Sequence, residues 1–222
     1  GRAEYTLPCR IGDYTDLYPA VFSPAGMELT VFEAARGELP DDLDDYDGWI
    51  VSGSRHSTYD DEDWIPDLEE LVRRIVADGG PLVGICFGHQ LTAQALGGKV
   101  EPAAVGWGVG VKSFEVVAPA PWMGHVAEMR LLMSHRDQVT RLPGGAEVIA
   151  TSDYCPVGAY RIGDRVFCVQ GHPEFVPELS RILMERRRSI IGDEVVDEAM
   201  GTLDGPVDGA RTVAWMADFF SR

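Results

Sequence analysis

The chain has 222 residues, with 19 Lys and Arg against 36 Asp and Glu, which gives a formal net charge of -17 at pH 7. This acidity disfavours nucleic acid and anionic membranes as partners, because like charges repel. With no apolar run long enough for a bilayer, no leader pattern and no metal-binding or disulfide spacing among its four cysteines, the sequence predicts one cytoplasmic domain, 1–222, without metal or cofactor.

The first half of the chain alternates between helix and strand patterns. The expected elements are a helix within 17–25, a strand at 27–32, an acidic loop at 38–47, a buried strand at 48–51, a helix at 64–77 and a second buried strand at 81–83. Strands and helices that alternate at this spacing predict right-handed crossovers and parallel strands with helices on both faces.

The second half of the chain is dominated by short alternating runs. Strands are expected at 109–117, 128–133, 146–151, 158–161 and 165–170, with a hairpin turn at Gly163-Asp164, and helices at 177–191 and 207–220. The predicted fold class is therefore α/β, with a mostly parallel central sheet, helices on both faces and a mixed or antiparallel edge.

The segment 84–90, Gly-Ile-Cys-Phe-Gly-His-Gln, joins the second buried strand to a helix pattern. Small residues on both sides of one reactive side chain are typical of a sharp strand-to-helix turn that carries a nucleophile. Gly84 and Gly88 are expected to lie too close to neighbouring backbone for any side chain. The first turn of the helix favours a negatively charged sulfur, so we expect Cys86 to be the nucleophile.

A base for this nucleophile is predicted far downstream, in Gly171-His172-Pro173-Glu174. His172 follows a buried strand, and the carboxyl ends of parallel strands meet at one edge of a sheet. Glu174 is placed to accept a hydrogen bond from one imidazole nitrogen, which leaves the other to exchange a proton with Cys86. For an oxyanion, the expected donors are the backbone amide of Phe87 and the turn at Gly53-Ser54.

These motifs resemble the paired signatures of class I, triad-type glutamine amidotransferases. The segment 133–139, Met-Ser-His-Arg-Asp-Gln-Val, is similar to one in the glutamine domain of GMP synthetase. The resemblance implies that Cys86 forms a γ-glutamyl thioester, that His172 moves the protons and that Glu174 orients His172. It also implies that Gln90 and the backbone around Ser134 and His135 hold the amino acid end of the substrate.

The chain departs from the family pattern in two places. Many members have Gly-Gly-Pro where this sequence has Gly53-Ser54-Arg55, so the oxyanion donor is expected to be the Ser54 amide. The family usually opens with an apolar strand, and residues 1–16 supply none, so we expect either a sequence that begins late or a sheet that is one strand short.

Four functions remain open at this stage. The first is hydrolysis of the glutamine side-chain amide, with ammonia released or passed to a synthetase partner subunit. The segment 51–64 resembles stand-alone members, some of which hydrolyse γ-glutamyl peptides, and this is the second. The others are a non-catalytic regulatory subunit that binds a γ-glutamyl ligand, and a cysteine hydrolase of some other amide.

Overall fold

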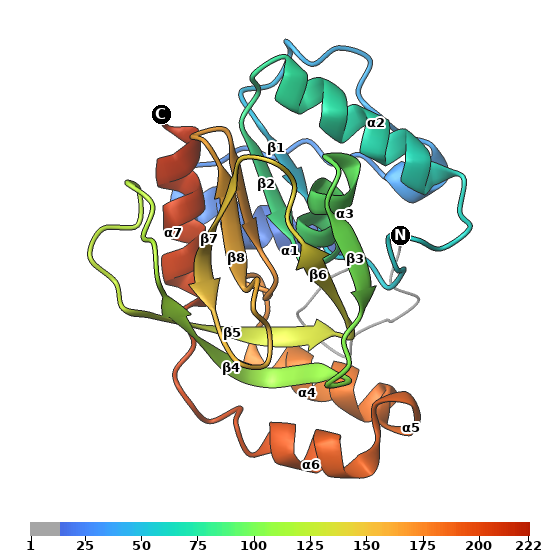
Figure 1. Ribbon diagram of the computed structural model, residues 1–222, viewed down its shortest axis with the longest axis vertical. Coiled ribbons are helices and arrows are strands. Elements are labelled where there is room, and N and C mark those ends of the chain that lie inside the picture. Colours follow the sequence, from blue (N-terminus) through green and yellow to red (C-terminus); the bar gives the residue numbers. More distant parts are fainter. Residues whose placement is uncertain (1–13) are drawn as a thin grey trace.

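The computed structural model describes residues 14–222 (Figure 1). The opening residues 1–13, where the sequence predicts no strand, lie outside the described part of the chain, and so does Cys9.

A seven-stranded sheet forms the centre of the molecule. In spatial order its strands are β1 (Trp49–Val51), β2 (Leu82–Ile85), β9 (Val166–Val169), β8 (Ala159–Ile162), β7 (Ala146–Thr151), β4 (Gly108–Val116) and β5 (Glu128–His135). The pairs β1–β2 and β2–β9 are parallel, and the other pairs are antiparallel. The α/β fold class is confirmed, with an antiparallel part that extends further than the edge the sequence predicts.

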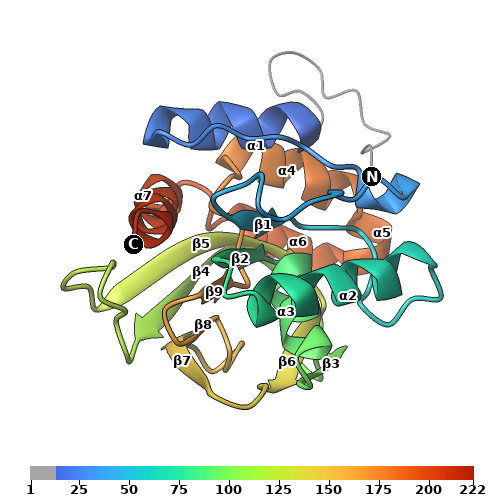
Figure 2. The same cartoon turned by 90° about the horizontal axis from the view of Figure 1, so that it is seen from above.

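Helices cover both faces of this sheet, as predicted (Figure 2). On one face lie α2 (Trp64–Ala77) and α3 (Phe87–Ala95), and on the other α1 (Tyr14–Phe22), α4 (Pro177–Arg186) and α7 (Gly209–Phe220), with α5 (Arg188–Ile191) and α6 (Asp193–Met200) beside β4 and β5. Two short 3₁₀ turns, Ser23–Ala25 and Ala34–Arg36, follow α1. No helix within 14–222 has the length and apolarity needed to cross a membrane.

The central strands are buried on both faces because their side chains alternate between two apolar clusters. In β9, Val166 and Cys168 pack with α2 and α3, whereas Phe167 and Val169 pack with α1 and α7. This explains why the sequence shows a continuous apolar run there instead of an alternating one. The helix at 64–77 is found at the predicted bounds, since one apolar stripe faces the sheet.

Two sequence expectations are wrong, and two elements were not predicted. Residues 27–32 form no strand: Met27 and Leu29 pack on the core through their side chains, and no backbone ladder joins them. The helix at 177–191 is split at Arg187, whose backbone leaves the helical region. A small sheet of β3 (Lys99–Pro102) and β6 (Asp137–Arg141) and the helix α6 were not predicted.

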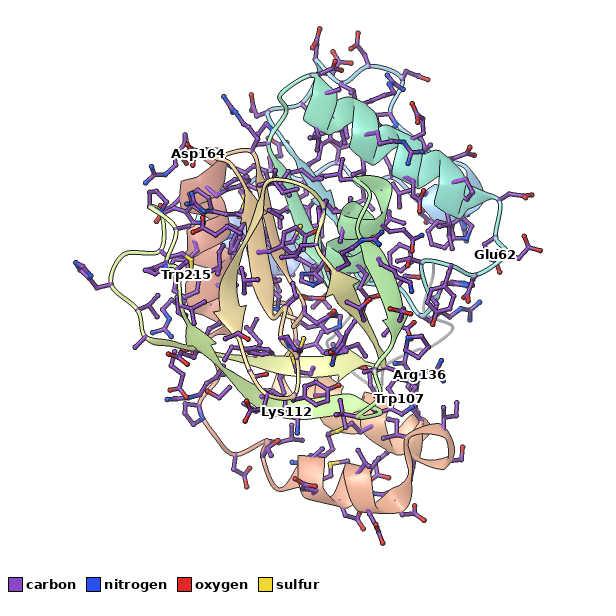
Figure 3. The ribbon with its side chains drawn as sticks, in the orientation of Figure 1. Glu62, Trp107, Lys112, Arg136, Asp164 and Trp215 are labelled. Atoms are coloured by element: carbon purple, nitrogen blue, oxygen red, sulfur yellow. The ribbon has the colours of Figure 1, made fainter. Side chains whose placement is uncertain are left out.

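Because β2 and β9 are parallel, their carboxyl ends lie side by side at one edge of the sheet. Ile85 at the end of β2 pairs with Val169 at the end of β9, so the segments that follow them leave the sheet side by side. The His172 amide donates to the Leu132 carbonyl in β5 at 2.8 Å, which joins this segment to a third strand. In Figure 3, Asp164, at the β8–β9 turn, lies at the upper left of the molecule, and Arg136, just after β5, lies at the right, below the middle.

Candidate active site

Cys86 occupies a strained turn between β2 and α3. Its backbone angles are φ 53° and ψ -101°, and within 14–222 it is the one non-glycine residue with positive φ. Strain of this kind costs on the order of 1–3 kcal/mol and persists only where the surroundings enforce it. The sharp turn predicted from the sequence is therefore present, with Cys86 at its apex.

Close backbone packing enforces this turn, as expected from Gly84 and Gly88. A Cβ on Gly88 would lie 2.0 Å from the Val51 carbonyl oxygen in β1. A Cβ on Gly84 would lie 2.6 Å from the Gly88 carbonyl oxygen and 2.8 Å from the Cys168 sulfur. Both contacts are far shorter than van der Waals distance, so the strand, turn and helix fit together only with glycine at these positions.

His172 and Glu174 form a buried pair beside Cys86. His172 Nδ1 lies 2.7 Å from Glu174 Oε1, and the two side chains are 4% and 0% exposed. Burial would lower the pKa of His172, but the nearby Cys86 sulfur and the Glu174 carboxylate outweigh it and raise that pKa. The pair therefore favours a protonated imidazole that is hydrogen-bonded to Glu174.

Gly53 lies close to both the His172 imidazole and the Cys86 side chain. A Cβ on Gly53 would lie 2.9 Å from His172 Cε1 and 3.8 Å from the Cys86 Cβ. The loop after β1 thus covers the imidazole and the nucleophile together. The structure brings the three predicted triad residues and the predicted glycine turn into one place.

The predicted oxyanion donors differ in what they contact. The Gly53 amide donates to the Tyr18 hydroxyl at 3.4 Å, so it is engaged within the protein. The amides of Ser54 and Phe87 have no acceptor among residues 14–222. Phe87 begins α3, where the positive end of the helix dipole adds to the donor. Of the predicted oxyanion donors, Ser54 and Phe87 are therefore the two whose amides are not engaged within the described chain, and their role stays a prediction.

Gln90 is buried and tied into the site by its side-chain amide. Gln90 Nε2 donates to the Asp137 carbonyl oxygen at 2.7 Å and to Gln170 Oε1 at 3.1 Å. These contacts connect α3 with the start of β6 and the end of β9. These bonds place Gln90 in a network that the sequence did not indicate, and its contact with the substrate stays a prediction.

Ser134 and His135, at the end of β5, face different surroundings. His135 Nε2 lies 3.3 Å from the Tyr154 hydroxyl, and burial, with added repulsion from His172, lowers the pKa of His135 to about 3, so that the ring is neutral. The Ser134 hydroxyl accepts a hydrogen bond from Arg187 Nη1 at 3.2 Å. His135 lies three residues after Leu132, whose carbonyl oxygen accepts from the His172 amide, so His135 and His172 belong to the same part of the fold.

Several buried polar atoms around the site lack a protein partner. Within 14–222 these include His135 Nδ1, Gln170 Nε2 and Glu174 Oε2. Buried polar atoms in folded proteins are nearly always hydrogen-bonded. These three atoms belong to residues that contact, or lie next in sequence to, residues of the predicted site.

Sequence reasoning missed three residues of this site: Tyr18, which donates to Glu174, Gln170, which accepts from Gln90, and Phe175, which stacks on His172. Gln170 and Phe175 flank the His-Pro-Glu segment and could have been found by their position. A single tyrosine in a short helix gives no such signal. The described residues contain no group of three or more His, Cys, Asp or Glu that could hold a metal.

Known proteins share this fold and much of this sequence. The family model for glutamine amidotransferase class-I matches residues 14–189. Gamma-glutamyl peptidase 3 of Arabidopsis thaliana is 33% identical over 204 residues, which cover 87% of this chain and 82% of that protein. A glutamine-hydrolyzing GMP synthase of Porphyromonas gingivalis is 38% identical over 139 residues, which cover 62% of this chain and 26% of that protein.

Solved structures give the same result for the fold. A glutamine amidotransferase from Thermotoga maritima has a TM-score of 0.77 at 18% identity, with 93% of this chain and 92% of that chain covered. One from Methylobacillus flagellatus has a TM-score of 0.73 at 25% identity, with 94% and 86% covered. The family resemblance seen in the motifs is confirmed: the chain belongs to the class I glutamine amidotransferase family and is an enzyme of hydrolase or amidotransferase type.

Proposed function

We propose that this protein hydrolyses γ-glutamyl amide bonds through a thioester on Cys86, with His172 and Glu174 completing a catalytic triad. The observation that carries the proposal is the 2.7 Å contact between His172 Nδ1 and Glu174 Oε1, with the other imidazole nitrogen left for a sulfur held at a strained turn. A nucleophile, a base and a group that orients the base are the parts that covalent acyl transfer requires.

In the proposed reaction, the Cys86 sulfur attacks the γ-carbonyl carbon of the substrate. The amides of Phe87 and Ser54 donate to the oxyanion that forms. His172 then gives its proton to the departing nitrogen, and the C–N bond breaks to leave a γ-glutamyl thioester. Water, deprotonated by His172, attacks the thioester and releases glutamate, while Glu174 keeps the imidazole in one orientation throughout.

We place γ-glutamyl peptides ahead of glutamine as substrates, which reverses the order expected from the sequence. The reason is coverage: gamma-glutamyl peptidase 3 aligns over most of both chains, whereas the GMP synthase match spans 26% of that protein. Gln90, Ser134 and His135 are proposed to hold the glutamyl end, which glutamine and γ-glutamyl peptides have in common.

A second candidate function is ammonia supply to a synthetase partner, which the GMP synthase match favours. A purely regulatory subunit is disfavoured, because ligand binding alone does not require a buried histidine–carboxylate pair beside a strained cysteine. We also propose that the protein acts in the cytoplasm and uses no metal or cofactor.

The test is release of glutamate and of the leaving amine from a panel that includes glutathione, a γ-glutamyl dipeptide, glutamine and a non-glutamyl amide. We expect glutathione or the dipeptide to be cleaved fastest and Cys86→Ala to abolish release. Cys155→Ala is the matched control, because Cys155 is also a buried free thiol but burial raises its pKa to about 12.

Each outcome of the panel separates the candidates. Glutamine cleaved faster than any peptide would favour the ammonia-supplying function. Preference for the non-glutamyl amide would point to the remaining cysteine hydrolase class. Equal release by wild type and Cys86→Ala would end the triad proposal, and a substrate-like electrophile that labels wild type but not Cys86→Ala would support it.

A further inference from the structure

We propose that Tyr18 is a positioning residue of the catalytic site: its hydroxyl fixes the Glu174 carboxylate and, at the same time, the turn at Gly53 that precedes the Ser54 amide. The inference rests on the proposed function. It adds a residue from α1, a helix that lies 156 positions from Glu174 in the chain and in which the sequence indicates no functional role.

Among the described residues, the Tyr18 hydroxyl donates one hydrogen bond and accepts another. It donates to Glu174 Oε1 at 3.1 Å, and it accepts from the Gly53 amide at 3.4 Å. Tyr18 is 6% exposed, so both bonds lie out of bulk water, where a hydrogen bond to a carboxylate is stronger than between neutral groups.

The first bond acts on the acid of the triad. Glu174 Oε1 is also the atom that contacts His172 Nδ1 at 2.7 Å, so this oxygen is held by the tyrosine and the imidazole together. Glu174 Oε2 has no partner within 14–222. Without the Tyr18 hydroxyl, the contact with His172 would be the sole hydrogen bond to this carboxylate among these residues, and its rotation would be less restricted.

The second bond acts on the loop that covers the site. Gly53 lies so close to the imidazole that an added Cβ would be 2.9 Å from His172 Cε1. By accepting from the Gly53 amide, Tyr18 holds the Ser52–Gly53 peptide, one residue before the peptide that carries the Ser54 amide. The Ser54 amide has no acceptor of its own within 14–222. One hydroxyl thus restrains both the carboxylate that contacts His172 and the turn that carries a proposed oxyanion donor.

The ring of Tyr18 is held independently of the site. It stacks on Phe22 with centroids 5.5 Å apart and planes at 12°, and both rings belong to the apolar cluster shared with α7. Phenylalanine would satisfy this packing equally well. The hydroxyl is therefore explained by its two hydrogen bonds and not by the core.

The experiment compares Tyr18→Phe with wild type on the best substrate of the panel. We expect kcat to fall about 10-fold, because this is the effect of losing about one hydrogen bond to a charged group. KM should stay within about 2-fold, because Tyr18 is not proposed to touch the substrate. Phe22→Leu is the control: it removes packing from the same helix and keeps both hydrogen bonds, so it should lower the melting temperature without the same loss of kcat.

A double-mutant cycle with Glu174→Gln identifies the route of the effect. If Tyr18 acts largely through Glu174, Tyr18→Phe should cost much less in the Glu174→Gln background than in wild type. A kcat within 2-fold of wild type, or fully additive losses, would overturn the inference. An equal loss in Phe22→Leu would do the same. Absence of γ-glutamyl cleavage by the wild type would instead refute the proposed function, so the two failures are distinguishable.

Discussion

The rings of His172 and Phe175 lie face to face, with centroids 3.9 Å apart and planes only 10° from parallel. Phe175 is itself fixed in the apolar cluster that joins β5 with α4 and α6. Because the His172 amide is also bonded to Leu132, backbone and ring are both restrained. The imidazole plane is thereby set in an orientation that directs Nδ1 to Glu174.

Replacing Phe175 with leucine should therefore lower kcat more than stability alone explains. The smaller side chain removes the flat surface under the imidazole, which then samples orientations in which Nδ1 misses Glu174. Leu179→Ala is the matched control, since Leu179 lies in the same cluster and the change costs about 2–5 kcal/mol. Urea unfolding and steady-state kinetics on both variants check this prediction. An equal fall of kcat in the two variants would mean that Phe175 contributes only to core packing.

The Glu174→Gln variant should show whether Glu174 orients His172 for catalysis without contributing to substrate binding. The amide keeps the size of the side chain but removes the charge that helps to raise the pKa of His172. We expect kcat to drop by about 10²-fold, the range typical of general acid–base groups, with KM little changed. Glu178→Gln, in the first turn of α4, is the neighbouring carboxylate control. If kcat is unchanged in Glu174→Gln, the orientation of the His172 imidazole does not depend on the Glu174 carboxylate.

Gly88→Ala should be strongly destabilising, because its Cβ would meet the Val51 carbonyl oxygen at 2.0 Å and neither backbone can yield cheaply. Overpacking of this kind typically costs about 1–3 kcal/mol or more. Gly144→Ala is the control, because its Cβ would meet nothing within 4 Å and its φ is not positive. A Gly88→Ala protein with wild-type melting temperature and activity would mean that α3 and β1 are packed less closely than described.

The sequence predicted the nucleophile turn well because short-range chemistry dictates it. Gly84, Cys86 and Gly88 show their role through spacing and size alone, and the packing against Val51 and Cys168 bears this out. The helix at 64–77 was equally predictable, since one apolar stripe determines both its type and its buried face.

Elements that depend on distant partners were not predictable in the same way. Residues 27–32 alternate as a strand does, yet a strand exists only if another backbone accepts its hydrogen bonds, and sequence alternation cannot supply one. β3 is the converse case: it is short and mostly exposed, and it is a strand because β6 pairs with it. Tyr18 was missed for the same reason, because Glu174 and Gly53, to which its hydroxyl is bonded, are far away in the chain.

His89 should make stability depend on pH. The residue is fully buried beside Tyr160, with ring centroids 4.9 Å apart, and burial lowers the pKa of His89 from 6.5 to about 3. Between these two values the unfolded chain binds a proton that the folded protein does not, so the free energy of unfolding falls as pH drops below about 6.5.

At pH 5 this single histidine should account for about 2 kcal/mol of lost stability relative to pH 7.5, since one pKa unit corresponds to about 1.4 kcal/mol. His89→Phe keeps a ring against Tyr160 and removes the titration. We therefore expect the variant to lose about 2 kcal/mol less than wild type between the two pH values, measured by urea unfolding. Identical losses would show that the folded protein accepts a charge on His89. The complete burial of this side chain makes such a charge energetically unfavourable.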